Sequence, residues 1–189
     1  MRWMATVALV VGLGLVARSG PITAADGPAN GSILASSPGH DLLLTVGDDV
    51  RTAHVTREGL SSNGVTLTRF PGRLAGHVGV ESVDLRIEPG RLEGQIGDRG
   101  IGLDVVRAGD ALQVMGTFGA RSVAMEVRHN GIHAQIGPCW YSLSLISGSY
   151  RGSVACGARP QVLALSVPVA FVAQDDVELA AMLTALLAR

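Results

Sequence analysis

A five-residue segment in which apolar and polar residues alternate recurs through residues 65 to 154, in pairs joined by turns. One set of segments starts at intervals of 18, 20, 20 and 18 residues, at Leu74, Leu92, Leu112, Ile132 and Tyr150. A second set starts at Val65, Val83, Ile101, Val123 and Tyr141. Apolar residues at every second position give a strand one buried face and one wet face. The repeat therefore predicts antiparallel β-structure.

Two architectures fit short strands repeated in this way: an antiparallel meander that forms a barrel or sandwich, and a stacked β-solenoid. The two cysteines favour the meander. If Ser147 and Gly148 form a two-residue hairpin turn, Cys139 lies opposite Cys156 at a closely spaced pair of positions that accepts a disulfide. A solenoid rung of about 20 residues does not stack positions that are 17 apart. We expect an all-β meander of about 10–12 short strands, with the solenoid as the alternative.

The connections between strands are rich in glycine and proline. Pro71–Gly72 and Pro89–Gly90 favour type II turns, whose twist does not match a tight hairpin, so we expect longer or more open connections there. Residues 59 to 64, with the sequence GLSSNG, are predicted to form a loop.

A C-terminal helix is predicted over residues 175 to 189. Asp175 and Glu178 have the spacing of a capping box, and Leu179, Met182, Leu183 and Leu186 follow at helical intervals. We expect this helix to dock on the protein's own apolar sheet edge or barrel mouth. A dimer contact and an interfacial membrane helix are the alternatives.

Residues 1 to 25 have the layout of a secretory signal peptide: a positive start, an apolar run of about 15 residues and small residues before Asp26. That run is too short to span a bilayer, and no transmembrane segment is expected in the mature chain. Residues 26 to 40 are expected to be a flexible leader, and residues 41 to 189 a single domain. A disulfide between Cys139 and Cys156 agrees with a secreted or periplasmic location.

Charge and composition exclude several classes of function. The formal net charge is −1, so the chain lacks the basic surface that a nucleic-acid partner requires. The short strands and few aromatic residues argue against an outer-membrane barrel. His129 and His133 are separated by a turn and do not converge on a metal, and His40–Asp41 has no activated nucleophile beside it. The carboxylates Asp84, Asp104 and Glu126 are explained by a solvated face. No catalytic site, metal site or cofactor is predicted.

Trp140 and Arg151 are the candidate binding residues. Strand alternation turns Trp140 to the wet face, where an indole can stack on a sugar ring or a partner's side chain, and we expect Arg151 to lie near it. The alternative is a structural role beneath the helix or a loop.

The sequence favours an exported, non-catalytic structural or binding module of the cell envelope or extracellular space, with a protein or carbohydrate as a candidate partner. The second hypothesis is a carrier with a small apolar ligand inside the barrel, since Gly94, Gly116, Ala134 and Gly152 are small residues on the inward face. The third is a hydrolase whose site is not recognisable from the sequence.

The first prediction concerns processing. Signal peptidase is expected to cleave after Ala24 or Ala25, because small residues there satisfy the enzyme, and to leave a mature chain starting at Ala25 or Asp26. The intact mass of protein recovered from the medium or periplasm measures this. Full-length chain recovered from the inner membrane would instead show an uncleaved anchor.

Overall fold

The structure of the protein, a computed structural model, describes residues 33–34, 41–157, 159–168, 171 and 175–187. All of them belong to one unit, Ser32–Arg189. The predicted signal peptide and most of the predicted leader lie outside the described residues, so those two predictions remain untested.

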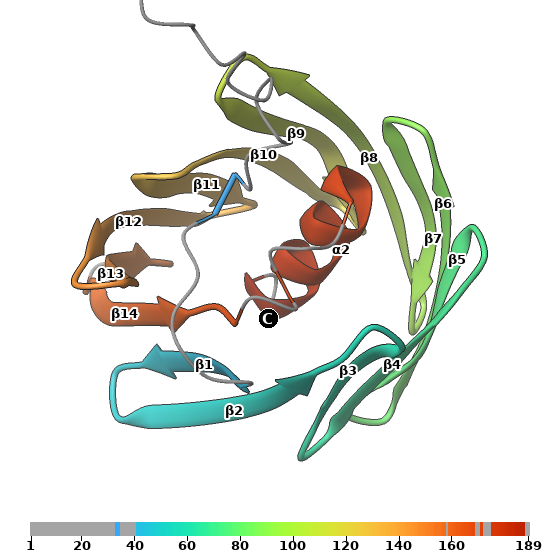
Figure 1. Ribbon diagram of the computed structural model, residues 1–189, viewed down its shortest axis with the longest axis horizontal. Coiled ribbons are helices and arrows are strands. Elements are labelled where there is room, and N and C mark those ends of the chain that lie inside the picture. Colours follow the sequence, from blue (N-terminus) through green and yellow to red (C-terminus); the bar gives the residue numbers. More distant parts are fainter. Residues whose placement is uncertain (1–32, 35–40, 158, 169–170, 172–174, 188–189) are drawn as a thin grey trace, which may run out of the picture. The chain divides into compact units, whose positions relative to one another are not determined.

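In the described part of the chain, fourteen antiparallel strands follow one another around a closed barrel (Figure 1). They are β1 (Asp41–Val46), β2 (Asp49–Val55), β3 (Gly59–Ser62), β4 (Val65–Phe70), β5 (Arg73–Val78), β6 (Glu81–Glu88), β7 (Arg91–Ile96), β8 (Arg99–Ala108), β9 (Ala111–Phe118), β10 (Arg121–Arg128), β11 (Gly131–Ile136), β12 (Cys139–Ile146), β13 (Ser149–Ala155) and β14 (Gln161–Ser166). Each strand pairs with its neighbours in sequence, and β14 pairs with β1 to close the ring. The meander is confirmed, its barrel form is settled, and the solenoid is excluded.

The expected count of 10–12 strands was too low, and one reason is β3. Gly59–Ser62 was predicted to be a loop because glycine, serine and asparagine dominate it and the residues after it. One buried side chain, Leu60, and pairing to both β2 and β4 hold it in the sheet. Such a short strand has too few alternating positions to be recognised from its sequence.

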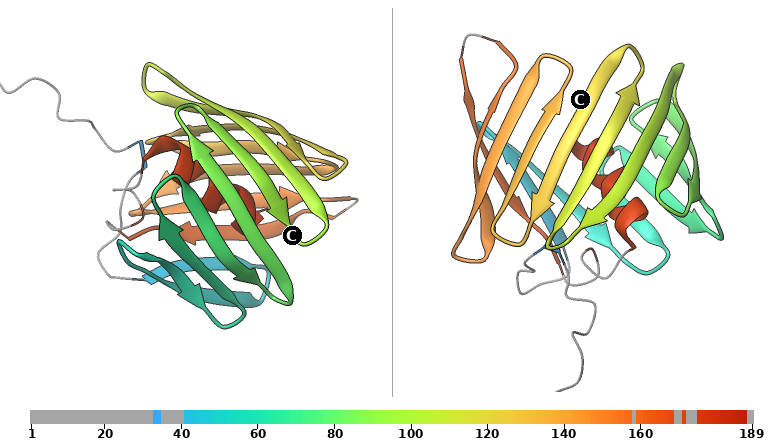
Figure 2. Two further views of the ribbon diagram at one scale, coloured as in Figure 1. Left: turned by 90° about the vertical axis from the view of Figure 1, so that its right-hand side faces the viewer. Right: turned by 90° about the horizontal axis from the view of Figure 1, so that it is seen from above.

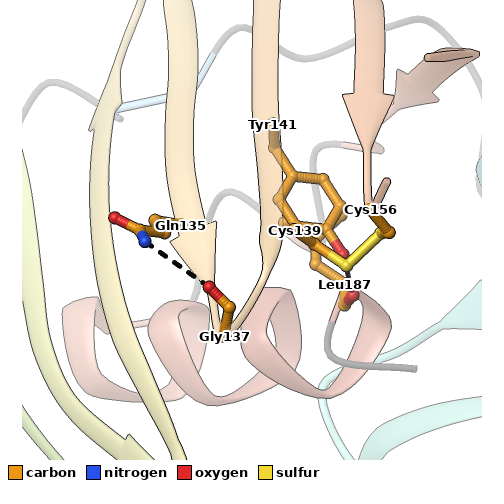
Figure 3. The surroundings of a disulfide bond; sticks show 6 residues. All are labelled: Gln135, Gly137, Cys139, Tyr141, Cys156 and Leu187. Carbon is orange, nitrogen blue, oxygen red and sulfur yellow. Dashed lines mark hydrogen bonds between the residues drawn. A yellow bond between two sulfur atoms is a disulfide. The ribbon is translucent and has the colours of Figure 1, made fainter. Parts of the chain in front are cut away.

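The disulfide and the register of the last hairpin agree with the prediction. Ile146 pairs with Ser149 across the two-residue turn, and Trp140 pairs with Ala155. Cys139 and Cys156 follow in this register, are bonded to each other and have Cα atoms 4.0 Å apart (Figure 3).

The Pro–Gly connections are tighter than expected. Phe70 pairs with Arg73 and Glu88 with Arg91, so Pro71–Gly72 and Pro89–Gly90 are two-residue turns. The turn glycines have positive φ, 66° at Gly72 and 74° at Gly90, as type II turns require. Their carbonyls accept hydrogen bonds from Ile87 and Val105 in the following strands, at 2.9 and 2.8 Å. These bonds tie each turn to the second strand after it.

Several glycines on the strands are required by close contact between neighbouring backbones. A Cβ at Gly94 would lie 2.1 Å from the Asp84 carbonyl oxygen, and one at Gly116 would lie 2.0 Å from that of Gly102. A Cβ at Gly152 would likewise lie 1.8 Å from the carbonyl oxygen of Ser142. Gly94 and Gly116 also have φ values of 153° and 155°, which side chains with a Cβ rarely adopt. These glycines are therefore explained by close backbone contact in the barrel wall, and not by space for a ligand as the carrier hypothesis supposed.

The C-terminal helix α2 (Asp176–Leu187) lies inside the barrel, where it contacts β6, β7 and β8 (Figures 1 and 2). The helix and its docking on the protein's own sheet are confirmed. It lies inside the barrel, and not on a sheet edge or at the barrel mouth as expected. Leu179, Met182 and Leu183 are buried, and so are Ala180, Ala181 and Thr184 on the other sides of the helix. A helix without a polar face is buried on all sides, and here the barrel supplies the apolar surroundings.

Polar contacts hold both ends of α2. Asp175 caps the helix through its Oδ1 atom, which accepts hydrogen bonds from the amides of Val177 and Glu178, both at 2.9 Å. Two inward-pointing arginines at this end bind the first turn: Arg107 pairs with Asp176, and Arg69 pairs with Glu178 at 2.7 Å. At the other end the Tyr141 hydroxyl donates to the Leu187 carbonyl at 2.5 Å (Figure 3).

The close backbone contact at Gly94 leads to a stability prediction. Gly94→Ala is expected to lower the free energy of unfolding by about 2 kcal/mol or more, because the new Cβ meets a backbone carbonyl at a strained φ. The control is Gly100→Ala on β8, where no atom lies within 4 Å of the place that the new methyl group would take. There the change is expected to stay within about 0.5 kcal/mol. Thermal or urea unfolding measures both. Equal effects would mean that the close approach at Gly94 does not constrain the fold.

A second prediction follows from Glu178. Burial, with the nearby negative charge of Asp175, raises the pKa of its carboxyl above the ordinary 4.5, and Arg69 offsets only part of this. The folded state then binds the proton more tightly than the unfolded state. Glu178 therefore favours folding most below pH 4.5, and this contribution is lost as pH rises through the raised pKa.

Glu178→Gln removes that titration. The difference in Tm between wild type and variant should therefore shift against the wild type as pH rises from about 4 to about 7. Comparing the two proteins cancels the opposite trend of surface carboxylates such as Asp84, whose pKa is lowered by Arg73. A difference that is constant, or that grows in favour of the wild type, would contradict the assignment.

Candidate functional site

The outer face of strands β9 to β13 carries a row of mainly apolar side chains. Cross-strand pairing places them in one line around the barrel wall: Met115, Ala124, Gln135, Trp140 and Ala155. Trp140 and Met115 are 61% and 62% exposed, which is unusual for large apolar residues in the middle of a sheet. Alternation explains their direction, because their strand neighbours Tyr141 and Val114 point into the barrel and are buried.

A second row, one step along the strands, is polar. It consists of Gln113, Glu126, His133, Ser142 and Ser153, again paired across successive strands. The His133 Nδ1 atom lies 3.5 Å from the Ser142 hydroxyl. Each apolar side chain of the first row therefore has polar neighbours that offer both hydrogen-bond donors and acceptors.

The two rows together line a hollow of about 580 Å³, which we call the Trp140 groove. Small side chains create it: Ala124 lies between Met115 and Gln135, and Ala155 lies beside Trp140. The side chains of Trp140 and Met115 therefore project beyond the small side chains of Ala155 and Ala124 beside them. Because every wall belongs to a strand of the closed barrel, the groove is held rigid by the sheet.

One carboxylate contributes a fixed charge to the groove. Glu126 accepts a hydrogen bond from Arg128 at 2.7 Å, and this contact, with the charge of His133, lowers the pKa of the Glu126 carboxyl. The group is therefore ionised at neutral pH. Arg128 balances part of its charge, since the same guanidinium also contacts Asp110 at 3.1 Å.

The two residues predicted for binding do not form one site. Trp140 points outward as predicted and is part of the groove. Arg151 pairs with Ser144, whereas Trp140 pairs with Ala155, so four residues along the strand separate them. The expected proximity was wrong because it did not apply the hairpin register that pairs Cys139 with Cys156, which already places Ala155 beside Trp140. Met115 was missed, although the alternation around Leu112 and Val114 already turns it outward.

The other candidates are dispersed over the surface. Asp84 pairs with Arg73 at 2.7 Å and Asp104 with Arg91 at 2.6 Å, as expected of a solvated face. His129 lies in the turn before β11 and His133 on the outer face of that strand. No group of three or more His, Cys, Asp or Glu side chains suited to a metal is found among the described residues.

Asp41 has a partner that sequence analysis did not foresee. Its Oδ1 atom lies 2.9 Å from Nδ1 of His54, its cross-strand neighbour on β2, and Ser61 on β3 is the next residue in that row. A carboxyl group, an imidazole and a hydroxyl thus lie in one row across three neighbouring strands. The Asp41 and His54 side chains are half-exposed, and water therefore surrounds the pair. His40 lies outside the described residues.

Among the helices that the structure describes, none is long and apolar enough to cross a membrane. The chain matches no protein-family model, no curated protein and no solved structure.

Proposed function

We propose that this protein is an exported, non-catalytic binding module that recognises carbohydrate through the Trp140 groove. The observation that carries the proposal is the exposed indole of Trp140 at the wall of a rigid hollow of about 580 Å³. A volume of this size suits a small ligand or one unit of a polymer, since small-molecule sites measure roughly 300–1,000 Å³.

The chemistry of the groove favours a sugar. A sugar ring has an apolar face of C–H groups and an edge of hydroxyls that both donate and accept hydrogen bonds. Trp140 offers a flat apolar surface, and Gln113, Gln135 and Ser142 offer the mixed donors and acceptors beside it. Glu126 is the one carboxylate among the described residues that line the groove, and its contact with Arg128 weakens its pull on a cationic ligand.

The two alternative functions receive less support. A carrier that encloses its ligand at the centre of the barrel needs space that α2 occupies. A hydrolase that acts through an acid, an imidazole and a hydroxyl holds them in a cleft around the substrate, and the Asp41 and His54 side chains are half-exposed on the outer face of the sheet. Export is supported by the Cys139–Cys156 disulfide, since such bonds persist in oxidising compartments.

Intrinsic fluorescence gives a direct test. The chain has two tryptophans, Trp3 and Trp140, so cleavage of the predicted signal peptide leaves Trp140 as the only reporter. We expect one or more members of a panel of soluble neutral oligosaccharides, built from glucose, mannose, galactose or N-acetylglucosamine, to shift or quench its emission. The dissociation constant then comes from calorimetry, which needs no tryptophan.

Substitutions locate the binding. Trp140→Ala is expected to weaken it by about 30-fold, the ratio that corresponds to roughly 2 kcal/mol for a central aromatic contact. The matched control is Ile146→Ala, an exposed apolar residue on the same strand outside the groove, which should leave affinity unchanged. If no glycan in the panel binds, or if Trp140→Ala binds as tightly as the wild type, the proposal fails.

A further inference from the structure

A second hollow lies inside the barrel, at the end where α2 finishes. Its volume is about 370 Å³. Its apolar walls come from three parts of the barrel and from the helix: Leu44, Val46, Val154, Leu163, Leu186 and Leu187. The Cys139–Cys156 disulfide and Tyr141 lie beside the end of the helix in the same region (Figure 3). We call this hollow the mouth pocket.

The mouth pocket has a deep apolar part and a polar opening. Leu44, Leu163 and Leu187 are buried, whereas Val46 and Leu186 are half-buried nearer the opening. The polar residues that line it are Asp49, Arg51 and Gln161. The Asp49 and Arg51 side chains are 54% and 42% exposed, which places them at the boundary with solvent. A molecule can therefore enter at this end without removing α2.

The helix end that forms one wall is fixed. The Tyr141 hydroxyl donates to the Leu187 carbonyl, and the disulfide joins β12 to the end of β13 beside it. Both contacts act next to the hollow, so its shape is set before any ligand arrives. A preformed apolar pocket loses little conformational entropy when a ligand binds to it.

The opening selects against ionic ligands. The Arg51 guanidinium contacts Asp49 through two nitrogens, Nε at 2.7 Å and Nη2 at 2.5 Å from Oδ2, so each charge is already balanced by the other. Gln161 carries both a donor and an acceptor and no charge. Among the described residues that line the opening, a charged head group would find no unbalanced opposite charge, and it would lose water on entry.

We propose that the mouth pocket binds a small uncharged amphiphile, with its apolar part against Leu44, Val154, Leu163 and Leu187 and its polar head at Gln161 and the Asp49–Arg51 pair. This site is separate from the Trp140 groove and does not depend on the carbohydrate proposal. It places the ligand between the helix end and the barrel wall, instead of at the barrel centre.

The test uses the oxidised mature protein and N-phenyl-1-naphthylamine, an uncharged probe that fluoresces in apolar surroundings. We expect saturable binding of one probe per chain, with 1-decanol displacing it at a concentration at least about tenfold lower than decanoate does at pH 8. Absence of saturable binding, or equal displacement by the alcohol and the carboxylate, would overturn the proposal.

Two matched variants locate the probe. Val46→Phe fills the opening of the mouth pocket and is expected to weaken probe binding by about tenfold or more. Val78→Phe is the control, because Val78 is also half-buried at the end of its strand but lines a different hollow, beside Phe118 and Ala185. Loss of binding in Val78→Phe with retention in Val46→Phe would assign the probe to that other hollow and contradict the proposal.

Two further measurements keep the result interpretable. If Val46→Phe melts far below the wild type, Leu186→Phe narrows the same pocket from the helix side and replaces it. Trp140→Ala is expected to bind the probe as the wild type does. Loss of the probe in that variant would place it in the outer groove and overturn the assignment.

Discussion

The inward faces of the strands form a continuous apolar wall, and the fold depends on what covers it. A barrel of about eight strands is narrow enough for its own side chains to fill, but a wider ring leaves a lumen. Here the ring has fourteen strands in the described part of the chain. The helix α2 occupies the lumen with leucine, methionine and alanine side chains that are buried on several sides of the helix. The closed barrel and the internal helix are therefore one solution, since neither buries its apolar surface without the other.

The polar contacts described for the helix lie at its ends. Arg69 and Arg107 reach inward from the wall to the carboxylates of the first turn, and Tyr141 holds the last carbonyl. Between these points the packing is apolar and has no fixed direction of its own. The end contacts therefore determine how deeply α2 sits and which side of it faces β6 to β8.

Strand alternation and the cysteine spacing predicted much of this fold, because a period of two and a hairpin register are local properties. The face of Trp140 and the pairing of Cys139 with Cys156 follow directly from them. The closure of β14 on β1, the burial of α2 in the lumen and the four-residue strand β3 depend on the assembled ring. Only part of the candidate site could be predicted from the sequence. The predicted hairpin register already places Ala155, and not Arg151, beside Trp140, so the link to Arg151 was a misreading of a predictable register. The registers of β9, β10 and β11 follow from the assembled sheet, so the row that links Met115 to Trp140 was missed.

The pairing of β1 with β14 also bears on the order in which the chain folds. Leu43 pairs with Ser166, 123 positions later in the chain, and α2 follows β14, so the contacts that complete the barrel join strands that are far apart in the sequence. Closing a loop of this length has a high entropic cost, so pairing between strands so far apart in sequence forms slowly. Successive hairpins can form earlier, but their apolar faces remain uncovered until β14 and α2 have been synthesised. Ring closure and helix entry are thus expected to occur together, late in folding. Until then the inward apolar faces of the strands are the longest-lived exposed surface, and a chaperone would bind there.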